Sequence, residues 1–195
     1  MNSGSPIPRS SVPTVGELCQ AFPFGRLRIR DLDPPADRGW LHDWVRRDYA
    51  RFWGMMGKSV DAVEAEYVRL LARSGYEVIV GEVEEQPLFI GELYDPRTDA
   101  VGKVYAARDS DRGIHFIAAP PCGRPLAGFT TRSLNVVLAY ALSSARISRL
   151  LVEPDARNEK MIQLCRRLGF CAGRIVELPE KTARLMFLDR DEFNP

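Results

Sequence analysis

The sequence predicts a single α+β domain in which helices flank one mixed β-sheet. Its 195 residues match the usual size of one domain. Hydrophobic residues make up 45% of the chain and charged residues 27%, which is typical of a globular protein with a packed core. Segments with the two-residue period of strands occur between segments with helical spacing, and no internal repeat is apparent.

Residues 1–18 are predicted to form a flexible tail, and residues 19–195 the folded domain. The first 14 residues contain three prolines and four serines and little that could be buried. They lack the apolar segment of an export signal, and the most apolar run, residues 134–142, is much shorter than the roughly 20 residues that span a bilayer. We therefore expect a cytoplasmic protein without a membrane partner.

The first half of the chain is predicted to contain a strand, two helices and a hairpin. Apolar and charged residues alternate in the first strand, and residues 33–39 are predicted to form the turn that ends it. Ser59 is a possible N-cap of the second helix. An acidic turn at residues 84–86 joins the two hairpin strands. The expected boundaries are 27–32 for the strand, 40–53 and 59–73 for the helices, and 76–83 and 87–94 for the hairpin.

The second half is predicted to contain a buried strand, a glycine- and proline-rich loop, and then a helix, a strand, a second helix and an antiparallel pair. Thr130 or Thr131 is expected to cap the first helix, and Gly169 to end the second. The expected boundaries are 113–120, 121–128, 130–145, 149–153, 158–169, 172–178 and 182–188.

Charge and cysteine usage narrow the classes of ligand. With 27 basic and 26 acidic residues the formal net charge is +1, so we expect no nucleic-acid partner. The four cysteines form no C-x-x-C pair and there are only two histidines, so we expect neither a metal site nor a disulfide framework. A small molecule or a protein is the expected partner.

The loop at residues 121–128 has the setting of a phosphate site. A loop that opens a helix leaves backbone N–H groups unpaired at the positive end of the helix dipole. Gly128 allows close backbone approach, and Arg124 and Arg132 could add positive charge. The alternative is an ordinary connecting loop.

Two further groups of residues are candidates for a site. His115 lies in the predicted strand at residues 113–120, and Asp155 follows the end of the next strand. A histidine near a carboxylate suits general-base chemistry, whereas the alternative is a hydrogen-bonded core histidine. The aromatic residues at 40–53 could line a ligand pocket together with His42, or could simply belong to the core.

Four sequence blocks occur in order along the chain: residues 42–45 with 49–55, residues 91–96, residues 113–120 with 128–130, and residues 152–158 with 178–183. Together they resemble the Gcn5-related N-acetyltransferase (GNAT) superfamily, and more specifically its branch of hydroxamate siderophore acyltransferases. That branch includes the alcaligin-type succinyltransferases and the mycobactin-pathway lysine acyltransferases. The resemblance covers roughly residues 27–187.

The resemblance implies a mostly antiparallel central sheet and transfer of a succinyl or acetyl group from acyl-CoA to an N-hydroxylated diamine or N6-hydroxylysine. His115 would be the base and Asp155 its partner. The implied acyl-CoA residues are Ile117 or Ala118 for an oxyanion-stabilising amide, Arg124, Gly128, Phe129 and Thr130 for the pyrophosphate, and Asn158 for the pantetheine arm. The implied acceptor residues are His42, Trp44, Phe52, Trp53 and Lys181.

Two positions depart from the superfamily pattern. The usual Arg/Gln-x-x-Gly-x-Gly/Ala loop is replaced by residues 124–129, and Cys165 stands where many members have a tyrosine that protonates the departing thiolate. The alternatives to the siderophore assignment are a general amine or aminoglycoside acetyltransferase and a non-catalytic acyl-CoA-binding module. The non-catalytic module would be a partner of a siderophore synthetase. Such a synthetase is also a possible partner of the siderophore acyltransferase.

Overall fold

The computed structural model describes residues 14–20, 22–121 and 126–195. Its strands are β1 (Arg28–Asp31), β2 (Glu77–Val83), β3 (Gln86–Tyr94), β4 (Asp111–Ala118), β5 (Arg149–Val152), β6 (Cys171–Glu177) and β7 (Thr182–Asp189). Its α-helices are α1 (Val15–Gln20), α2 (Pro34–Val45), α3 (Val60–Leu71), α4 (Phe129–Ala141) and α5 (Glu159–Arg167). Short 3₁₀ helices are η1 (Asp48–Trp53), η2 (Pro96–Thr98), η3 (Ala100–Lys103) and η4 (Arg190–Glu192).

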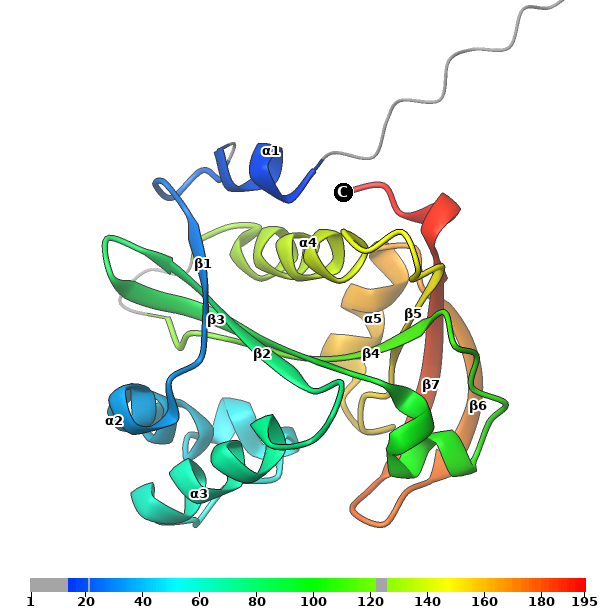
Figure 1. Cartoon of the computed structure of the whole chain (residues 1–195), viewed down its shortest axis with the longest axis horizontal. Coiled ribbons are helices and arrows are strands. Elements are labelled where there is room, and N and C mark those ends of the chain that lie inside the picture. Colours follow the sequence, from blue (N-terminus) through cyan, green and yellow to red (C-terminus); the bar gives the residue numbers. More distant parts are fainter. Residues whose placement is uncertain (1–13, 21, 122–125) are drawn as a thin grey trace, which may run out of the picture.

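The predicted α+β fold is confirmed. The seven strands form one sheet in the order β1-β2-β3-β4-β5-β7-β6 (Figure 1). The β4–β5 pair is parallel, and the other neighbouring strands are antiparallel. No helix in the described part of the chain has the length and apolar character needed to cross a bilayer.

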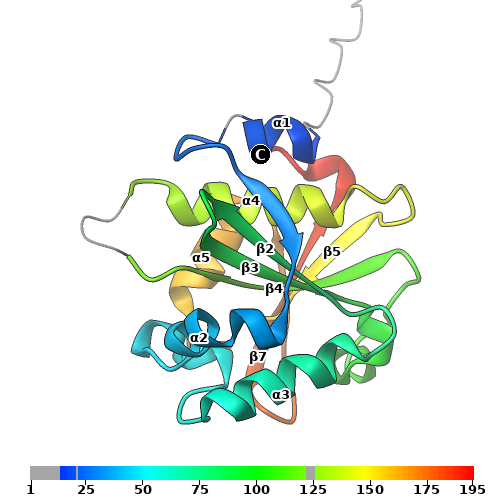
Figure 2. The same cartoon turned by 60° about the vertical axis from the view of Figure 1, so that its left-hand side comes forward.

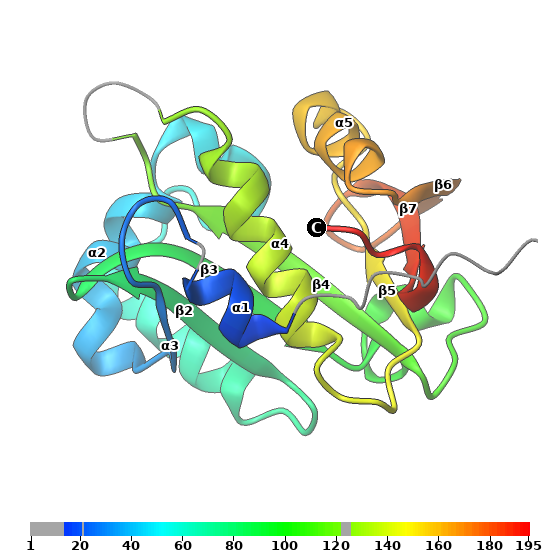
Figure 3. The same ribbon diagram turned by 90° about the horizontal axis from the view of Figure 1, so that it is seen from above.

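Helices cover both faces of the sheet. Helices α2 and α3 lie under one face, and α1 and α4 lie over the other (Figures 1 and 2). In the view from above, α4 crosses the sheet and α5 lies next to β5 and β7 (Figure 3). The two faces bury separate apolar clusters, one with α4 and α5 and the other with α2 and α3.

The N-terminal part of the fold differs from the sequence prediction in two places. Residues 1–13 of the predicted tail lie outside the described residues, whereas Val15 and Leu18 belong to α1 and pack against the core. Residues 33–39 are not a turn, because Asp33 caps α2 by accepting a hydrogen bond from the N–H of Ala36. Pro34 then occupies the first helical turn, where the missing N–H costs nothing.

The predicted helix at residues 40–53 is divided between α2 and η1. Helix α2 ends at Val45, and η1 ends at Trp53, which is followed by the C-cap residue Gly54 with a φ of 79°. Because of this division, the aromatic residues of η1 do not continue the helical face of α2. The division also lets η1 approach β4, where the hydroxyl of Tyr49 donates to the carbonyl of Ala118 at 3.1 Å.

Several local predictions are confirmed. Ser59 caps α3 by accepting from the N–H of Ala62. Glu84 and Glu85 form the hairpin turn with φ values of 49° and 62°, the conformation of a type I′ turn. Helix α4 is the exception, since its N-cap is Gly128 with a φ of 75° and no side-chain cap. The prediction that Thr130 or Thr131 caps this helix was therefore wrong.

Strands β4 and β5 separate soon after they meet. Their parallel pairing runs only from Asp111 opposite Arg149 to Gly113 opposite Leu151. Beyond that point β4 continues to Ala118, paired on its other side with β3. Beyond Gly113, the edge of β4 that faces β5 is therefore not paired with that strand.

Candidate active site

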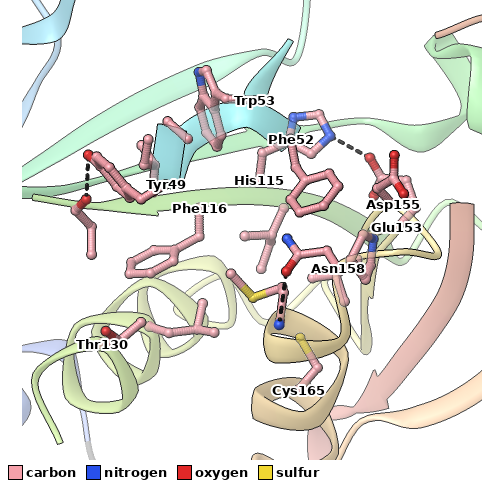
Figure 4. Close-up of a pocket in the computed structure, with 18 of the residues that line it drawn as sticks. Tyr49, Phe52, Trp53, His115, Phe116, Thr130, Glu153, Asp155, Asn158 and Cys165 are labelled. Atoms are coloured by element: carbon pink, nitrogen blue, oxygen red, sulfur yellow. Dashed lines mark hydrogen bonds and ion pairs between the residues drawn. The ribbon is translucent and has the colours of Figure 1, made fainter. Parts of the chain in front are cut away.

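A cavity of about 330 Å³ lies at the opening between β4 and the end of β5 (Figure 4). Residues of η1, β4, α4, the segment after β5, α5 and the turn between β6 and β7 contribute to its wall. Those that bear on the chemistry are Tyr49, Phe52, Trp53, His115, Ile117, Ala118, Thr130, Glu153, Asp155, Asn158, Cys165 and Lys181.

The backbone of β4 presents Ala118, rather than Ile117, to this cavity. The N–H of Ala119 donates to the carbonyl of Leu88 at 2.7 Å, so Ala119 and, by alternation, Ile117 direct their backbone groups toward β3. The backbone groups of Ala118 point the other way, and its carbonyl accepts from Tyr49. Of the two predicted amides, that of Ala118 faces the opening.

Three side chains form a row across neighbouring strands. Glu92 on β3 is directly opposite His115 on β4. Glu153 follows Leu151, the partner of Gly113, by two residues and so lies level with His115 on the β5 side. The Nδ1 of His115 lies 2.8 Å from Oε2 of Glu92. Its Nε2 hydrogen-bonds with Oε1 of Glu153 (Figure 4).

This row makes His115 a cation in the free protein. A neutral imidazole has one N–H and can donate to only one carboxylate, whereas the imidazolium donates from both nitrogens. Burial lowers the pKa of His115, but the charges and hydrogen bonds of Glu153 and Glu92 outweigh burial and raise it to about 10. Burial likewise raises the pKa of Glu153, and the charge of His115 outweighs it and lowers that pKa to about 2.

Each carboxylate of the row has a second neighbour. The Tyr76 hydroxyl donates to Oε2 of Glu92 at 2.5 Å. On the other side, Nζ of Lys181 lies 3.6 Å from Oε1 of Glu153. Lys181 is held there by the tight turn between β6 and β7, in which its backbone bonds with that of Leu178.

Asp155 lines the same cavity but does not contact His115. Its two oxygens accept from the guanidinium of Arg157 at 2.9 and 2.7 Å, and one also accepts from the Arg157 backbone N–H. These bonds, which outweigh partial burial, lower the pKa of Asp155. The carboxylates that orient the His115 ring are therefore Glu92 and Glu153, in place of the expected Asp155.

A second groove continues from this cavity to the start of α4. It is lined by Gly128, Phe129 and Thr130, and shares Thr130 and Asn158 with the first cavity. No side chain caps the N-terminus of α4, so its first backbone N–H groups have no side-chain partner there. Such a helix start is suited to binding an anion. Asn158 caps α5 by accepting from Met161. Arg124, also predicted here, lies outside the described residues.

The predicted acceptor residues divide into two groups. Phe52, Trp53 and Lys181 line the cavity. His42 and Trp44 do not line it, because both belong to α2. Nε2 of His42 lies 3.1 Å from the Lys58 carbonyl, and Trp44 is buried in the cluster between α2, α3 and the sheet.

Cys165 is also in the cavity wall, and burial raises the pKa of its thiol to about 12. It remains a neutral thiol at physiological pH and is packed within the core cluster that includes α4 and α5. The described residues contain no group of three or more histidine, cysteine, aspartate or glutamate side chains that could hold a metal ion.

Sequence reasoning missed Glu92 and Glu153 as functional residues. Both lie in blocks that carried the family resemblance, at residues 91–96 and 152–158. Their signal was an acidic residue within an otherwise apolar strand segment, since such a residue is rarely fully buried unless it is paired. Both are indeed buried, with 4% and 5% of their surface exposed.

Gly113 makes room for the ring that supports His115. The Tyr94 ring lies across Gly113 and is centred 4.9 Å from the His115 ring. A Cβ on Gly113 would come within 2.1 Å of Cζ of Tyr94. We therefore expect Gly113→Ala to lower the free energy of unfolding by about 1–3 kcal/mol, as overpacking does.

The matched control is Gly39→Ala. Gly39 lies within α2, and beyond the neighbouring backbone of that helix no atom lies within 4 Å of the position that an alanine Cβ would take. This variant should have a free energy of unfolding about 0.5–1 kcal/mol higher than that of the wild type, because alanine has a higher helix propensity than glycine. Chemical denaturation followed by circular dichroism measures both, and equal effects of the two substitutions would contradict the close approach of Tyr94.

Comparison with known proteins identifies the family. Residues 33–178 match the family model described as an acetyltransferase (GNAT) domain. The chain is 23% identical over 168 residues to the N(6)-hydroxylysine O-acetyltransferase of Escherichia coli. That match covers 86% of this chain and 53% of the relative, so the chain spans about half the length of this curated protein.

Solved structures share the fold. An uncharacterized protein from Bacillus halodurans superimposes with a TM-score of 0.79 at 24% identity, covering 86% of each chain. The aminoglycoside acetyltransferase AAC(6')-Ib, in complex with paromomycin and acetyl-CoA, gives a TM-score of 0.74 at 18% identity over 85% of this chain and 94% of that one. These structures share the fold, and the family match over most of the chain shows that it belongs to the GNAT acetyltransferase family.

Proposed function

We propose that this chain is an acyl-CoA-dependent N-acyltransferase that acylates the hydroxylated nitrogen of an N-hydroxy diamine or of N6-hydroxylysine, forming a hydroxamate of the kind found in siderophores. The acyl group is succinyl or acetyl, carried by CoA. The observation that supports this best is the similarity to an enzyme named as a hydroxylysine acetyltransferase, over nearly the whole GNAT domain. The four sequence blocks at residues 42–45 with 49–55, 91–96, 113–120 with 128–130, and 152–158 with 178–183 support the same branch.

The charge of the site favours an acceptor that arrives without a proton on its nitrogen. An alkyl amine with a pKa near ~10.4 is an ammonium at neutral pH and must lose a proton before it can attack. His115 is itself protonated in the free protein and must release its own Nε2 proton before it can act as a base, so an ammonium acceptor would require a second deprotonation before attack. A hydroxylamine is far less basic, arrives neutral, and needs a base only while it attacks the thioester carbon.

We assign the role of that base to His115. His115 first releases its Nε2 proton to solvent. As the nitrogen–carbon bond then forms and the carbon–sulfur bond breaks, the proton of the acceptor nitrogen passes to the free Nε2, and the sulfur leaves as a thiolate. Glu92 and Glu153 orient the ring and stabilise the imidazolium. Asp155 is paired with Arg157 and takes no part in the proton transfer.

The remaining predicted residues fit acyl-CoA along the continuous groove. The amide of Ala118 faces the opening and is the proposed donor to the developing oxyanion, an interaction that is worth about 10²–10³ in rate in other enzymes. The start of α4 at Gly128, Phe129 and Thr130 is the proposed pyrophosphate site. Phe52 and Trp53 wall the space left for the acceptor.

A thiol-release assay tests the substrate class. It should combine succinyl-CoA and acetyl-CoA with N-hydroxyputrescine, N-hydroxycadaverine and N6-hydroxylysine, and with the corresponding plain amines as matched controls. We expect at least one hydroxylated acceptor to exceed its plain counterpart in kcat/KM by tenfold or more. Equal turnover of putrescine and N-hydroxyputrescine would instead support a general amine acetyltransferase.

A further inference from the structure

We propose that Lys181 is a positioning residue that controls the proton on Nε2 of His115, by sharing the carboxylate of Glu153 with the imidazole. Glu92 acts oppositely and keeps the ring protonated at Nδ1. This inference deepens the proposed function and rests on the assignment of His115 as the base. The observation behind it is the unequal surroundings of the two carboxylates that bind one ring.

The Glu92 side of the ring is fixed. Glu92 is buried in the middle of the sheet, and its Oε2 accepts from both the Tyr76 hydroxyl and the Nδ1 of His115. Tyr67 lies close enough that burial first, and then the charge of Glu92, raise the pKa of Tyr67. Both tyrosines are neutral, so the charge of Glu92 is compensated by His115.

On the Glu153 side of the ring, one carboxylate oxygen lies beside two cationic groups, the imidazolium of His115 and the ammonium of Lys181. Oε1 of Glu153 bonds with Nε2 of His115 and lies 3.6 Å from Nζ of Lys181. The side chain of Lys181 is only 17% exposed, so its charge acts in a poorly hydrated place. Oε2 of Glu153 is buried and has no hydrogen-bond partner among the described residues.

This asymmetry determines which proton His115 can release. Loss of the Nδ1 proton would leave Glu92 buried beside neutral groups, which is costly for a charge. Loss of the Nε2 proton leaves Glu153 beside the ammonium of Lys181, which still compensates it. The geometry thus favours a neutral imidazole with its lone pair on Nε2, the nitrogen on the side of the cavity where β4 and β5 diverge.

The other groups around His115 do not provide such a cation. The titratable, charged or aromatic neighbours from every element packed against the ring are Glu92, Tyr94, Tyr76 and Tyr67 from the β2–β3 and α3 side, Trp53 from η1, Glu153 and the Asp155–Arg157 pair after β5, and Lys181. Arg157 is 81% exposed and is held by both oxygens of Asp155. Lys181 is therefore the cation placed to act on Glu153.

Proton NMR titration of the imidazole signals in the full chain tests this directly. The chain has only two histidines, so His42→Gln identifies the signals of His115. We expect Lys181→Met to raise the pKa of His115 by about 1 or more, since Glu153 loses its other cation, and Lys181→Arg to restore most of the original value. We expect Glu92→Gln to lower it by about 1 or more.

The opposite directions separate this proposal from a purely structural role for either residue. Circular dichroism checks folding, and if Glu92→Gln does not fold, Tyr76→Phe replaces it with the expectation of a raised His115 pKa. The proposal is overturned if the pKa of His115 is unchanged or lowered in Lys181→Met. These titrations need no substrate, so they stand even if the acceptor is not a hydroxylamine.

The kinetic counterpart is the acid limb of the pH profile of kcat/KM. It should move to higher pH in Lys181→Met and to lower pH in Glu92→Gln, in step with the titrations. If the titrations shift as expected while the acid limb stays in place, the coupling is real and His115 is not the base. That result would refute the proposed mechanism and leave the charge sharing established.

Discussion

His115→Ala is expected to reduce kcat by about 10²–10⁴-fold while leaving the binding of CoA nearly unchanged. The reason is that the ring lies at the opening between β4 and β5, apart from the groove at the start of α4 that suits the pyrophosphate. Thiol release measures the first quantity and titration calorimetry with CoA the second.

The control for this substitution is His42→Ala. His42 is the other histidine of the chain, lies in α2, and contacts the Lys58 carbonyl away from the cavity. It should retain most of the activity. Wild-type turnover in His115→Ala would remove His115 from the mechanism, and an equal loss in both variants would point to a general effect on the fold.

His115→Ala is also expected to change how the stability of the protein depends on pH. Removing the imidazolium leaves Glu92 and Glu153 as two buried carboxylates without their shared cation. Burial raises the pKa of Glu153, and the charge of His115 no longer opposes that effect, so the variant should lose stability as pH increases through neutrality and recover it in mild acid. His115→Gln, which can still donate one hydrogen bond, should lose less stability at neutral pH than His115→Ala.

Asp111→Ala is expected to lower the free energy of unfolding by about 3–5 kcal/mol, because it breaks a buried ion pair and leaves its cation behind. The Asp111 side chain is fully buried, and its oxygens accept two hydrogen bonds from the Arg149 guanidinium at 2.8 Å. Arg149 is itself 14% exposed. The pair joins β4 to β5 at the first step of their short parallel contact.

The pH dependence of this pair has a definite sign. Burial raises the pKa of Asp111, and the bonds from Arg149 and from the Arg108 backbone outweigh burial and lower it. The stabilisation is thus present above the unfolded pKa of about 3.9 and is lost as pH falls through the lower folded value. Urea denaturation at pH 7 should separate wild type from Asp111→Ala clearly, and the difference should shrink in acid.

A double substitution serves as the control for Asp111. Asp111→Ala with Arg149→Met removes both charges, so it should recover part of the lost stability relative to Asp111→Ala alone. A loss below about 1 kcal/mol in the single variant, or no recovery in the double one, would show that the pair contributes little to the β4–β5 junction.

Local patterns of the sequence determined much of the fold. The hairpin of β2 and β3, the Ser59 cap of α3, and the Gly169 end of α5 follow from turn and cap chemistry between neighbouring residues. The missed start of α2 is of the same kind, since Asp33 is an ordinary N-cap residue whose two following prolines suggested a turn. The break between α2 and η1 could not be predicted in this way, because no glycine or proline lies between the end of α2 and Gly54.

The sequence by itself determined that one α+β domain carries a histidine on a buried strand before a glycine-led helix, in the pattern of an acyltransferase. Only the tertiary structure decided what that histidine touches. Its carboxylate partners are 23 and 38 positions away in the chain, and strand register alone brings them level with it. Asp155 was the candidate partner in the family pattern, but Arg157, two residues on, neutralises it locally. The charge state of the site therefore depends on cross-strand neighbours, which sequence spacing does not encode.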